Sequence, residues 1–306
     1  MPSLQALAAC GPEQTSSAFL CYLRLSSLLV AQGQKEKAYE YLLAAQKTAE
    51  EDKAKSLLGA VEIAIANYWF QAGNLSKALD HAKTCLGFLD PACLGSSPLS
   101  LTSYHLLFAE CSLWAGNVTD ALASLSLLRE HVSPSSTSLV KESVLNCLDS
   151  SIRLASLYLL HGDINAATEI IEVAFPVAKE KGSKRAVAEA HVLLALLKSK
   201  QGHSDQEALL TEGLSTELAD KRVEGRLQLW AGIFYSTDSS NQEKAQSHFD
   251  KALQLSREAG DKFTEALALG HSALLTGSES ARTEALRFAE ELAAKLVVTL
   301  LNEVNT

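Results

Sequence analysis

Histidine and cysteine are the residues of this 306-residue chain that could hold a metal ion or attack a substrate. Zinc sites place them at short, fixed spacings, such as a Cys-x-x-Cys pair with histidines nearby. None of the six cysteines and eight histidines has such a spacing, and both residue types are spread along the whole chain. We therefore expect no metal site, and we interpret the cysteines as small buried hydrophobic residues of a reducing compartment.

Signatures of catalysis are also absent from the sequence. It contains no P-loop, no Gly-x-Ser-x-Gly elbow, no His-Glu-x-x-His and no dinucleotide-binding glycine motif. We therefore expect that the protein is not an enzyme and binds no cofactor. The basic run Lys179, Lys181, Lys184, Arg185 is interrupted by Glu180 and Gly182, so we interpret it as a solvated turn without a role.

The net charge of −9, from 27 basic and 36 acidic residues, repels phosphate backbones and anionic lipids. This excludes nucleic acid as a primary partner. No segment approaches the ~18 to 20 apolar residues that a membrane helix needs, so we expect no membrane insertion. The first seventeen residues, MPSLQALAACGPEQTSS, lack a secretory signal. These features favour a cytoplasmic or nuclear protein.

The elements that would position any functional residue are helices. Ala, Leu, Glu, Lys, Gln and Ser fill most positions, whereas proline occurs only six times and β-branched alternation is scarce. Four segments repeat one pattern, in which a glycine is followed five residues later by an alanine. The pairs are Gly33 and Ala38, Gly73 and Ala78, Gly116 and Ala121, and Gly162 and Ala167, at glycine spacings of 40, 43 and 46 residues. Such a period indicates stacked helical repeats.

Each position of this repeated pattern has a physical reason. The glycine ends a first helix by adopting a left-handed conformation that other residues pay ~1 kcal/mol or more to adopt. The alanine lets the second helix approach the first closely. Seven residues before each glycine the first helix also carries a small residue, namely Ser26, Ala66, Ala109 or Ala155. We expect the two helices to cross at these small residues.

This pattern resembles the tetratricopeptide repeat (TPR) superfamily, in a form with a longer period. The first repeat matches at Tyr22, Leu25, Ser26, Leu29, Gly33, Ala38, Leu42 and Ala45, and the fourth at Leu154, Ala155, Tyr158, Gly162, Ala167, Ile171 and Ala174. The terminal proline of the family is missing.

The resemblance implies an all-α fold, a right-handed superhelical solenoid of antiparallel helix pairs with about seven units and a C-terminal capping helix. We expect a single domain over residues 1–306, with units at approximately 14–50, 54–90, 100–132, 143–181, 184–218, 221–259 and 262–303. In the fifth unit we align Gly202 with Ala208, one residue late. The last unit ends in what we interpret as one long amphipathic helix.

The resemblance also implies a binding groove, because the first helices of TPR units line the concave wall. Wall positions of the family lie ten, nine, six, three and two residues before the glycine. With the sixth unit placed from the register of Tyr235, they give these candidate partner-binding residues: Leu23, Arg24, Ile63, Asn67, Phe70, Leu106, Leu107, Glu110, Trp114, Arg153, Leu193, Leu196, Arg226 and Trp230. A chaperone-tail clamp is not expected, because Ile63 occupies the place of the lysine that such a clamp needs.

The predicted wall is mainly apolar with a few arginines. It suits a helical or extended partner segment that carries apolar anchors, and Arg24, Arg153 and Arg226 could pair acidic residues beside them. Trp114 and Trp230 are the preferred anchors because an uncovered tryptophan is costly to leave in water, whereas Trp69 should be structural. The alternative is that the wall leucines simply pack between neighbouring first helices.

We therefore predict a protein-protein interaction adaptor or scaffold subunit within a multi-protein complex. The alternative is a TPR-like sensor or regulatory module that binds a small ligand or another part of a larger regulator. The sequence does not set the oligomeric state.

Overall fold

The computed structural model describes residues 15–31, 34–53, 55–88, 98–131, 141–202 and 206–303. Within these ranges the regular elements are helices and there is no strand. The chain consists of two compact modules, an N-terminal one, Met1–Cys111, and a C-terminal one, Ser112–Thr306. The all-α prediction is confirmed.

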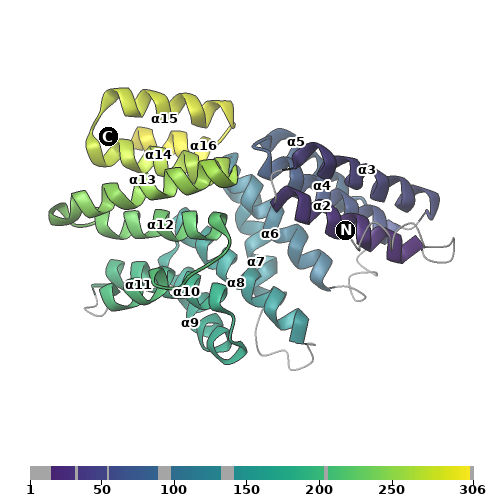
Figure 1. The fold of residues 1–306 in the computed structure, drawn as a ribbon, viewed down its shortest axis with the longest axis horizontal. Coiled ribbons are helices and arrows are strands. Elements are labelled where there is room, and N and C mark those ends of the chain that lie inside the picture. Colours follow the sequence, from purple (N-terminus) through teal and green to yellow (C-terminus); the bar gives the residue numbers. More distant parts are fainter. Residues whose placement is uncertain are drawn as a thin grey trace. The chain divides into compact units, whose positions relative to one another are not determined.

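The N-terminal module holds two packed helix pairs and most of a further helix (Figure 1). The helices are α2 (Thr15–Ala31), α3 (Lys35–Glu51), α4 (Lys55–Gln71), α5 (Leu75–Leu86) and α6 (Pro98–Trp114). Helix α2 packs on α3, α3 on α4 and α4 on α5. Their core is built around Phe19, Leu42, Val61 and Ile65, which are at most 1% exposed.

The C-terminal module continues the same arrangement. Its helices are α7 (Val118–His131), α8 (Lys141–His161), α9 (Ile164–Lys181), α10 (Lys184–Lys200), α11 (Gln206–Leu214), α12 (Lys221–Ser236), α13 (Gln242–Ala259), α14 (Lys262–Thr276), α15 (Glu279–Glu291) and α16 (Lys295–Glu303), with a short 3-10 turn η2 (Ser239–Asn241). Helices α8, α10, α12 and α14 are the first helices of successive pairs, and each lies beside the next (Figure 1). The second helices α9, α11, α13 and α15 each pack against the first helix of their own pair. This packing of first helix on first helix is what repeat stacking requires.

The glycine and alanine pattern takes the predicted geometry wherever the structure describes it. Gly73, Gly116 and Gly162 have φ of 81°, 77° and 90°, which is left-handed backbone. The paired alanines Ala38, Ala78, Ala121 and Ala167 are at most 1% exposed. Gly33 lies outside the described residues. The repeat is therefore a real packing unit, in which one residue turns the chain and the other lies in the helix crossing.

The turns close with the same hydrogen bonds in successive pairs. The amide of Gly73 donates to the carbonyl of Phe70, and the amide of Asn74 donates to Trp69, each at 2.9 Å. The Asn74 side chain then accepts from the amide of Lys77 and caps α5. Asp163 caps α9 in the same way. These bonds satisfy backbone groups that would otherwise be unpaired at the two helix ends.

Two details differ from the expectations. Ala208 is exposed, and the close approach in that unit is made instead by Gly213, which is buried on α11. A Cβ atom at Gly213 would lie 2.9 Å from the carbonyl oxygen of Ala188 and 2.7 Å from Val192. Gly213 follows the buried Leu210 by three residues, as Ala45 follows Leu42, so it holds the second small position of the repeat.

The C-terminal segment is broken into two helices rather than forming one long helix. Ala293 takes φ of 55° between α15 and α16, and α16 folds back over α14. A Cβ atom at Gly270 would lie 3.2 Å from Val297, so the two helices are close there. The Arg282 guanidinium donates to the carbonyl of Leu301 at 2.7 Å. The capping role that the sequence predicts thus belongs to a short helix, α16.

Candidate functional site

A buried carboxylate on α10 is the centre of a charge network on the first helices of the C-terminal module. Glu189 is 7% exposed. Arg226 of α12 donates to Glu189 Oε1 at 2.7 Å, and Arg185 Nε donates to Oε2 at 3.3 Å. Two guanidinium groups are needed because a buried carboxylate without partners would be strongly destabilising. The network therefore ties α10 to α12.

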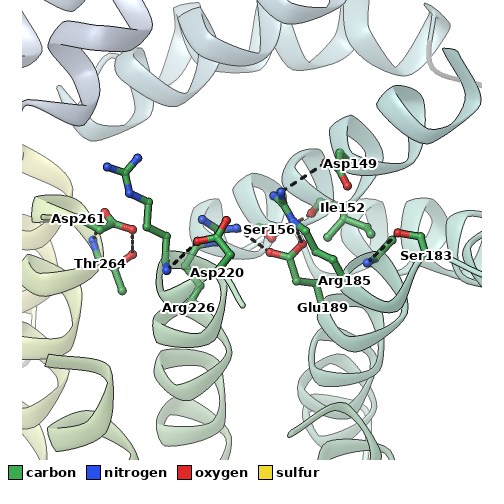
Figure 2. A network of polar contacts seen from close by, with 12 residues as sticks. Asp149, Ile152, Ser156, Ser183, Arg185, Glu189, Asp220, Arg226, Asp261 and Thr264 are labelled. Atoms are coloured by element: carbon green, nitrogen blue, oxygen red, sulfur yellow. Dashed lines mark hydrogen bonds and ion pairs between the residues drawn. The ribbon is translucent and has the colours of Figure 1, made fainter. Parts of the chain in front are cut away.

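The same network reaches α8 through Arg185. Its Nη1 atom lies 3.6 Å from Asp149 Oδ2 (Figure 2). Burial raises the pKa of the Asp149 carboxyl, and the nearby Glu189 adds to the rise, while Arg185, Arg153 and Arg226 oppose it. Three arginines and two carboxylates therefore share the faces of three adjacent first helices.

A second buried carboxylate repeats this arrangement at the start of α14. Glu265 is 6% exposed and accepts from Arg257 at 2.8 Å and from Lys262 at 3.0 Å. Helices α12 and α14 also begin with an aspartate cap, because Asp220 accepts from the amide of Arg222 and Asp261 accepts from Thr264 (Figure 2). The beginnings of these first helices are therefore fixed by polar contacts as well as by packing.

The predicted partner-binding residues divide by exposure. Seven are buried: Phe70, Leu106, Leu107, Trp114, Leu193, Leu196 and Trp230. Six are partly exposed, namely Leu23, Ile63, Asn67, Glu110, Arg153 and Arg226, and Arg24 is exposed. The polar candidates are thus accessible to a partner, whereas most apolar ones lie in contacts of the chain with itself.

The three tryptophans also differ in how far they are exposed. Trp114 is 4% exposed and packs on Phe263 of α14, with ring centroids 4.7 Å apart. Trp230 is 7% exposed. Trp69 is only partly buried, although it packs on Tyr39 and Tyr68 and has the Lys77 ammonium 3.9 Å from its ring centroid. The cover that Trp114 needs is therefore supplied by the protein itself.

Sequence reasoning missed Arg185, Glu189 and Asp149. Arg185 belongs to the basic run that we expected to be a solvated turn, and for this residue that expectation is wrong. A usable signal was present, because Arg185 and Glu189 are four residues apart and therefore adjacent on one helix face. The contact of Glu189 with Arg226 has no local signal, since it joins two different repeats.

Comparisons with known proteins were made at the level of sequence and of structure. No protein-family model matches the chain, and no curated protein matches it. Among solved structures, the Rap conjugation gene regulator of the plasmid pLS20, in complex with the Phr* peptide, superposes with a TM-score of 0.58 at 13% identity, covering 93% of this chain and 89% of the regulator. This chain has a TPR-like helical-repeat fold.

Two further solved structures match the chain at lower scores. BtubC from P. vanneervenii has a TM-score of 0.41 at 16% identity, covering 74% of this chain and 91% of BtubC. The TPR domain of P58(IPK) has a TM-score of 0.24 at 14% identity, covering 99% of this chain and 93% of the domain.

In the described ranges, no group of three or more histidine, cysteine or acidic side chains converges as a metal site would require. No helix in the same ranges is both long and apolar enough to cross a membrane. Among the cysteines, Cys85 is buried, and burial together with Glu62 raises the pKa of its thiol to about 12, so it is an unreactive thiol at neutral pH.

Acid should destabilise the C-terminal module through His271. Burial, with a smaller contribution from Lys200, lowers its pKa to about 4. In the unfolded chain the imidazole takes up a proton near pH ~6.5. The stability that the neutral imidazole contributes to the folded state is therefore complete above that pH and is lost as the pH falls towards about 4. We expect the free energy of unfolding to be up to about 2 kcal/mol lower at about pH 5.

The measurement is urea unfolding of the wild type and of His271→Gln at about pH 7.5 and pH 5. The variant should lose less stability than the wild type between these two values, because it has no imidazole to protonate. Equal losses in both proteins would show that His271 is protonated as easily in the folded state as in the unfolded one. His191 and His248 also have lowered pKa values, mainly through burial, so a residual loss is expected in the variant.

Proposed function

We propose that this protein is an interaction adaptor or scaffold subunit that holds a helical or extended segment of another protein against its first helices, within a multi-protein complex. The observation that carries the proposal is the arginine-rich face of α8, α10 and α12. Arg153, Arg185 and Arg226 stand there beside two carboxylates, of which Glu189 is buried. The side chains of Arg185 and Arg226 remain 38% and 32% exposed.

In this cluster three arginines outnumber two carboxylates, although the net charge of the protein is −9. Guanidinium groups are well suited to pair carboxylates, because they present several donors in a fixed plane. The two existing carboxylates hold the arginines in place, so that a partner would meet ordered side chains and lose less entropy on binding. We therefore propose an acidic partner segment, with apolar residues beside its acidic ones.

The wider set of candidate contacts is the fourteen wall residues predicted from the sequence. Within it we rank the accessible residues Arg24, Asn67, Arg153 and Arg226 above the buried leucines. The buried members would contribute by shaping the face, unless a partner opened the packing between first helices.

The test is peptide selection followed by substitution. Random peptides displayed on phage are selected on the purified chain, and we expect enrichment of Asp or Glu beside Leu or an aromatic residue. Arg153→Ala should then weaken the best synthetic peptide about tenfold, as loss of one charged hydrogen bond would. Affinity should also fall as ionic strength rises.

The matched control is Arg287→Ala, which removes an arginine of α15 that pairs with Glu291 and lies outside the first-helix face. It should leave the affinity unchanged. Peptides without acidic enrichment, or equal affinities for wild type and Arg153→Ala, would contradict the proposed use of this face. Circular dichroism of both variants establishes that they are folded.

A regulatory module is the second candidate, favoured by the similarity over most of the chain to a peptide-bound gene regulator. In that case the bound segment would be a short free peptide, or another part of a larger regulator, rather than a subunit of an assembly. Affinity purification from the native cell separates the two functions. Stable co-purifying proteins favour the adaptor, whereas a chain that purifies alone and binds a small ligand favours the regulator.

A further inference from the structure

Helix α2 carries an apolar stripe that the rest of the N-terminal module leaves open. Leu20 and Leu28 are 54% and 58% exposed, more than any other large hydrophobic side chain in the described ranges. Arg24 lies between them, four residues from each, so the three side chains share one face of the helix. We call these three residues the α2 stripe. Leu23, which is partly exposed, adjoins it.

The same positions are buried in first helices that have neighbours on both sides. Arg24 and Leu28 lie nine and five residues before the turn glycine of their repeat. The equivalent residues of α10 are Leu193 and Leu197, which are 2% and 0% exposed. In α14 the first of these positions is Ala268, which is also 0% exposed. These are therefore contact positions of the repeat, and α2 differs in exposing them.

The helix pair before a first helix supplies contacts at these positions. In α14 the position of Leu28 is held by Ser272, whose hydroxyl accepts from the Gln246 amide of α13 at 2.9 Å. Helix α10 likewise packs on α8 and α9, the pair before it. Helix α2 packs on α3 and α4, and the described ranges contain no helix before it (Figure 1). The α2 stripe therefore lies at an end of the stack, where a further helix can pack.

The charge in the stripe distinguishes between possible occupants. Arg24 is the only charged residue of α2, it is exposed, and no ion pair of its guanidinium occurs within the described ranges. A helix laid on the stripe would remove this group from water, which is costly unless a carboxylate meets it. A second copy of the chain is unsuited, because antiparallel pairing that matches the leucines of two α2 helices also brings two Arg24 side chains together. The occupant therefore carries an acidic residue.

We propose that the α2 stripe docks an amphipathic helix of another protein, in which one Asp or Glu interrupts a row of apolar residues. The stripe sets the pattern of that helix, namely an apolar, an acidic and an apolar residue at intervals of four. The carboxylate pairs with Arg24 while the apolar residues cover Leu20 and Leu28. The stripe shares only Arg24 with the fourteen wall residues, so it adds a docking surface to the proposed function.

The probe is a stapled helical peptide of about sixteen residues that carries leucine, glutamate and leucine at intervals of four on one face. A second peptide has lysine in place of the glutamate. Both carry a fluorophore, and their binding to the full chain is measured by fluorescence anisotropy. The wild type should bind the glutamate peptide saturably and about tenfold more tightly than the lysine peptide, which brings a second cation to Arg24.

Three variants locate the binding surface. Arg24→Glu should reverse the order of the two affinities, because the lysine peptide then brings the opposite charge. Leu28→Glu should weaken binding of the glutamate peptide about tenfold or more, since it places a carboxylate against an apolar residue. The matched control is Leu43→Glu, which changes a leucine of α3 that is 45% exposed and lies outside the stripe, and it should bind as the wild type does. All three positions are exposed, and circular dichroism establishes that the variants are folded.

Absence of saturable binding, equal affinities for the two peptides, or wild-type affinity in Leu28→Glu overturns the proposal. Two other results overturn it by identifying a different occupant. A dimer in sedimentation velocity that Leu28→Glu dissociates identifies a second copy, and an affinity raised about tenfold by removal of residues 1–13 identifies the chain's own N-terminal segment. Arg153→Ala should bind both peptides normally, so failure of either proposal leaves the other standing.

Discussion

Ala78→Glu will separate α5 from α4 and will lower the free energy of unfolding by about 3 to 5 kcal/mol, as an unpaired buried charge does. Ala78 is 0% exposed. The expected readouts are a lower urea midpoint and, by hydrogen exchange, loss of protection in α4 and α5. The effect should be greater than that of any surface substitution in the same helix.

The reason lies in how α4 and α5 cross. The Cys85 thiol donates to the carbonyl of Gly59 at 3.4 Å, and one helical turn away His81 Nδ1 lies 2.7 Å from Glu62 Oε2. A further turn along both helices brings Ala78 opposite Ala66, which is also 0% exposed. A glutamate side chain has no space between two backbones held this closely, and its charge would be buried there.

Ser76→Glu is the matched control, since it adds the same charge two residues earlier on an exposed position of α5. It should be neutral or slightly stabilising, because a carboxylate in the first turn interacts favourably with the helix dipole. If Ala78→Glu and Ser76→Glu proved equally stable, the close crossing of α4 and α5 would be wrong. The repeat would then lose its physical basis.

The parts of the fold that the sequence predicts are those decided by backbone geometry. Gly73, Gly116 and Gly162 are recognisable because only glycine takes left-handed backbone cheaply, and Ala38 and Ala78 because only a small side chain fits a close crossing. Each rule acts within about forty residues of sequence. The alternation of helices and turns therefore follows from local pattern.

The parts that the sequence did not predict depend on which distant residues meet. In the fifth unit Ala208 is exposed, and the close approach to α10 is made by Gly213, three residues after the buried Leu210. Ala293 breaks the final helix although alanine is the best helix former, because packing of α16 over α14 outweighs the local preference. In both cases tertiary packing decides between local alternatives.

The candidate site was predictable in kind but not in detail. Arg153 and Arg226 were placed on the first-helix face from their spacing to a repeat position, and the charges beside them were not foreseen. In the sequence Glu189 resembles an ordinary surface glutamate. Its burial and its contact with Arg226 depend on α12, which belongs to the next repeat. A charged residue that is buried between two repeats does not change the repeat pattern of the sequence, so a structure is needed to identify it.

Trp114→Ala will destabilise the C-terminal module by about 3 to 5 kcal/mol, the usual cost of removing a buried tryptophan. The indole is 4% exposed, and its neighbour Phe263 is equally buried. A cavity of this size beside Phe263 cannot be closed by the remaining side chains of the C-terminal module without moving a helix. The measurement is thermal and urea unfolding followed by circular dichroism.

A double-mutant cycle with Phe263→Leu tests whether these two rings account for the cost. Residues in contact couple by 0.5 to 3 kcal/mol, roughly, so the double variant should be more stable than the sum of the two single losses implies. Trp114→Phe, which keeps an aromatic ring beside Phe263, should lose much less than Trp114→Ala. Wild-type stability in Trp114→Ala would mean that Phe263 does not cover the indole in solution. Trp114 would then return to the accessible residues of the first-helix face, as an anchor for the partner rather than for the fold.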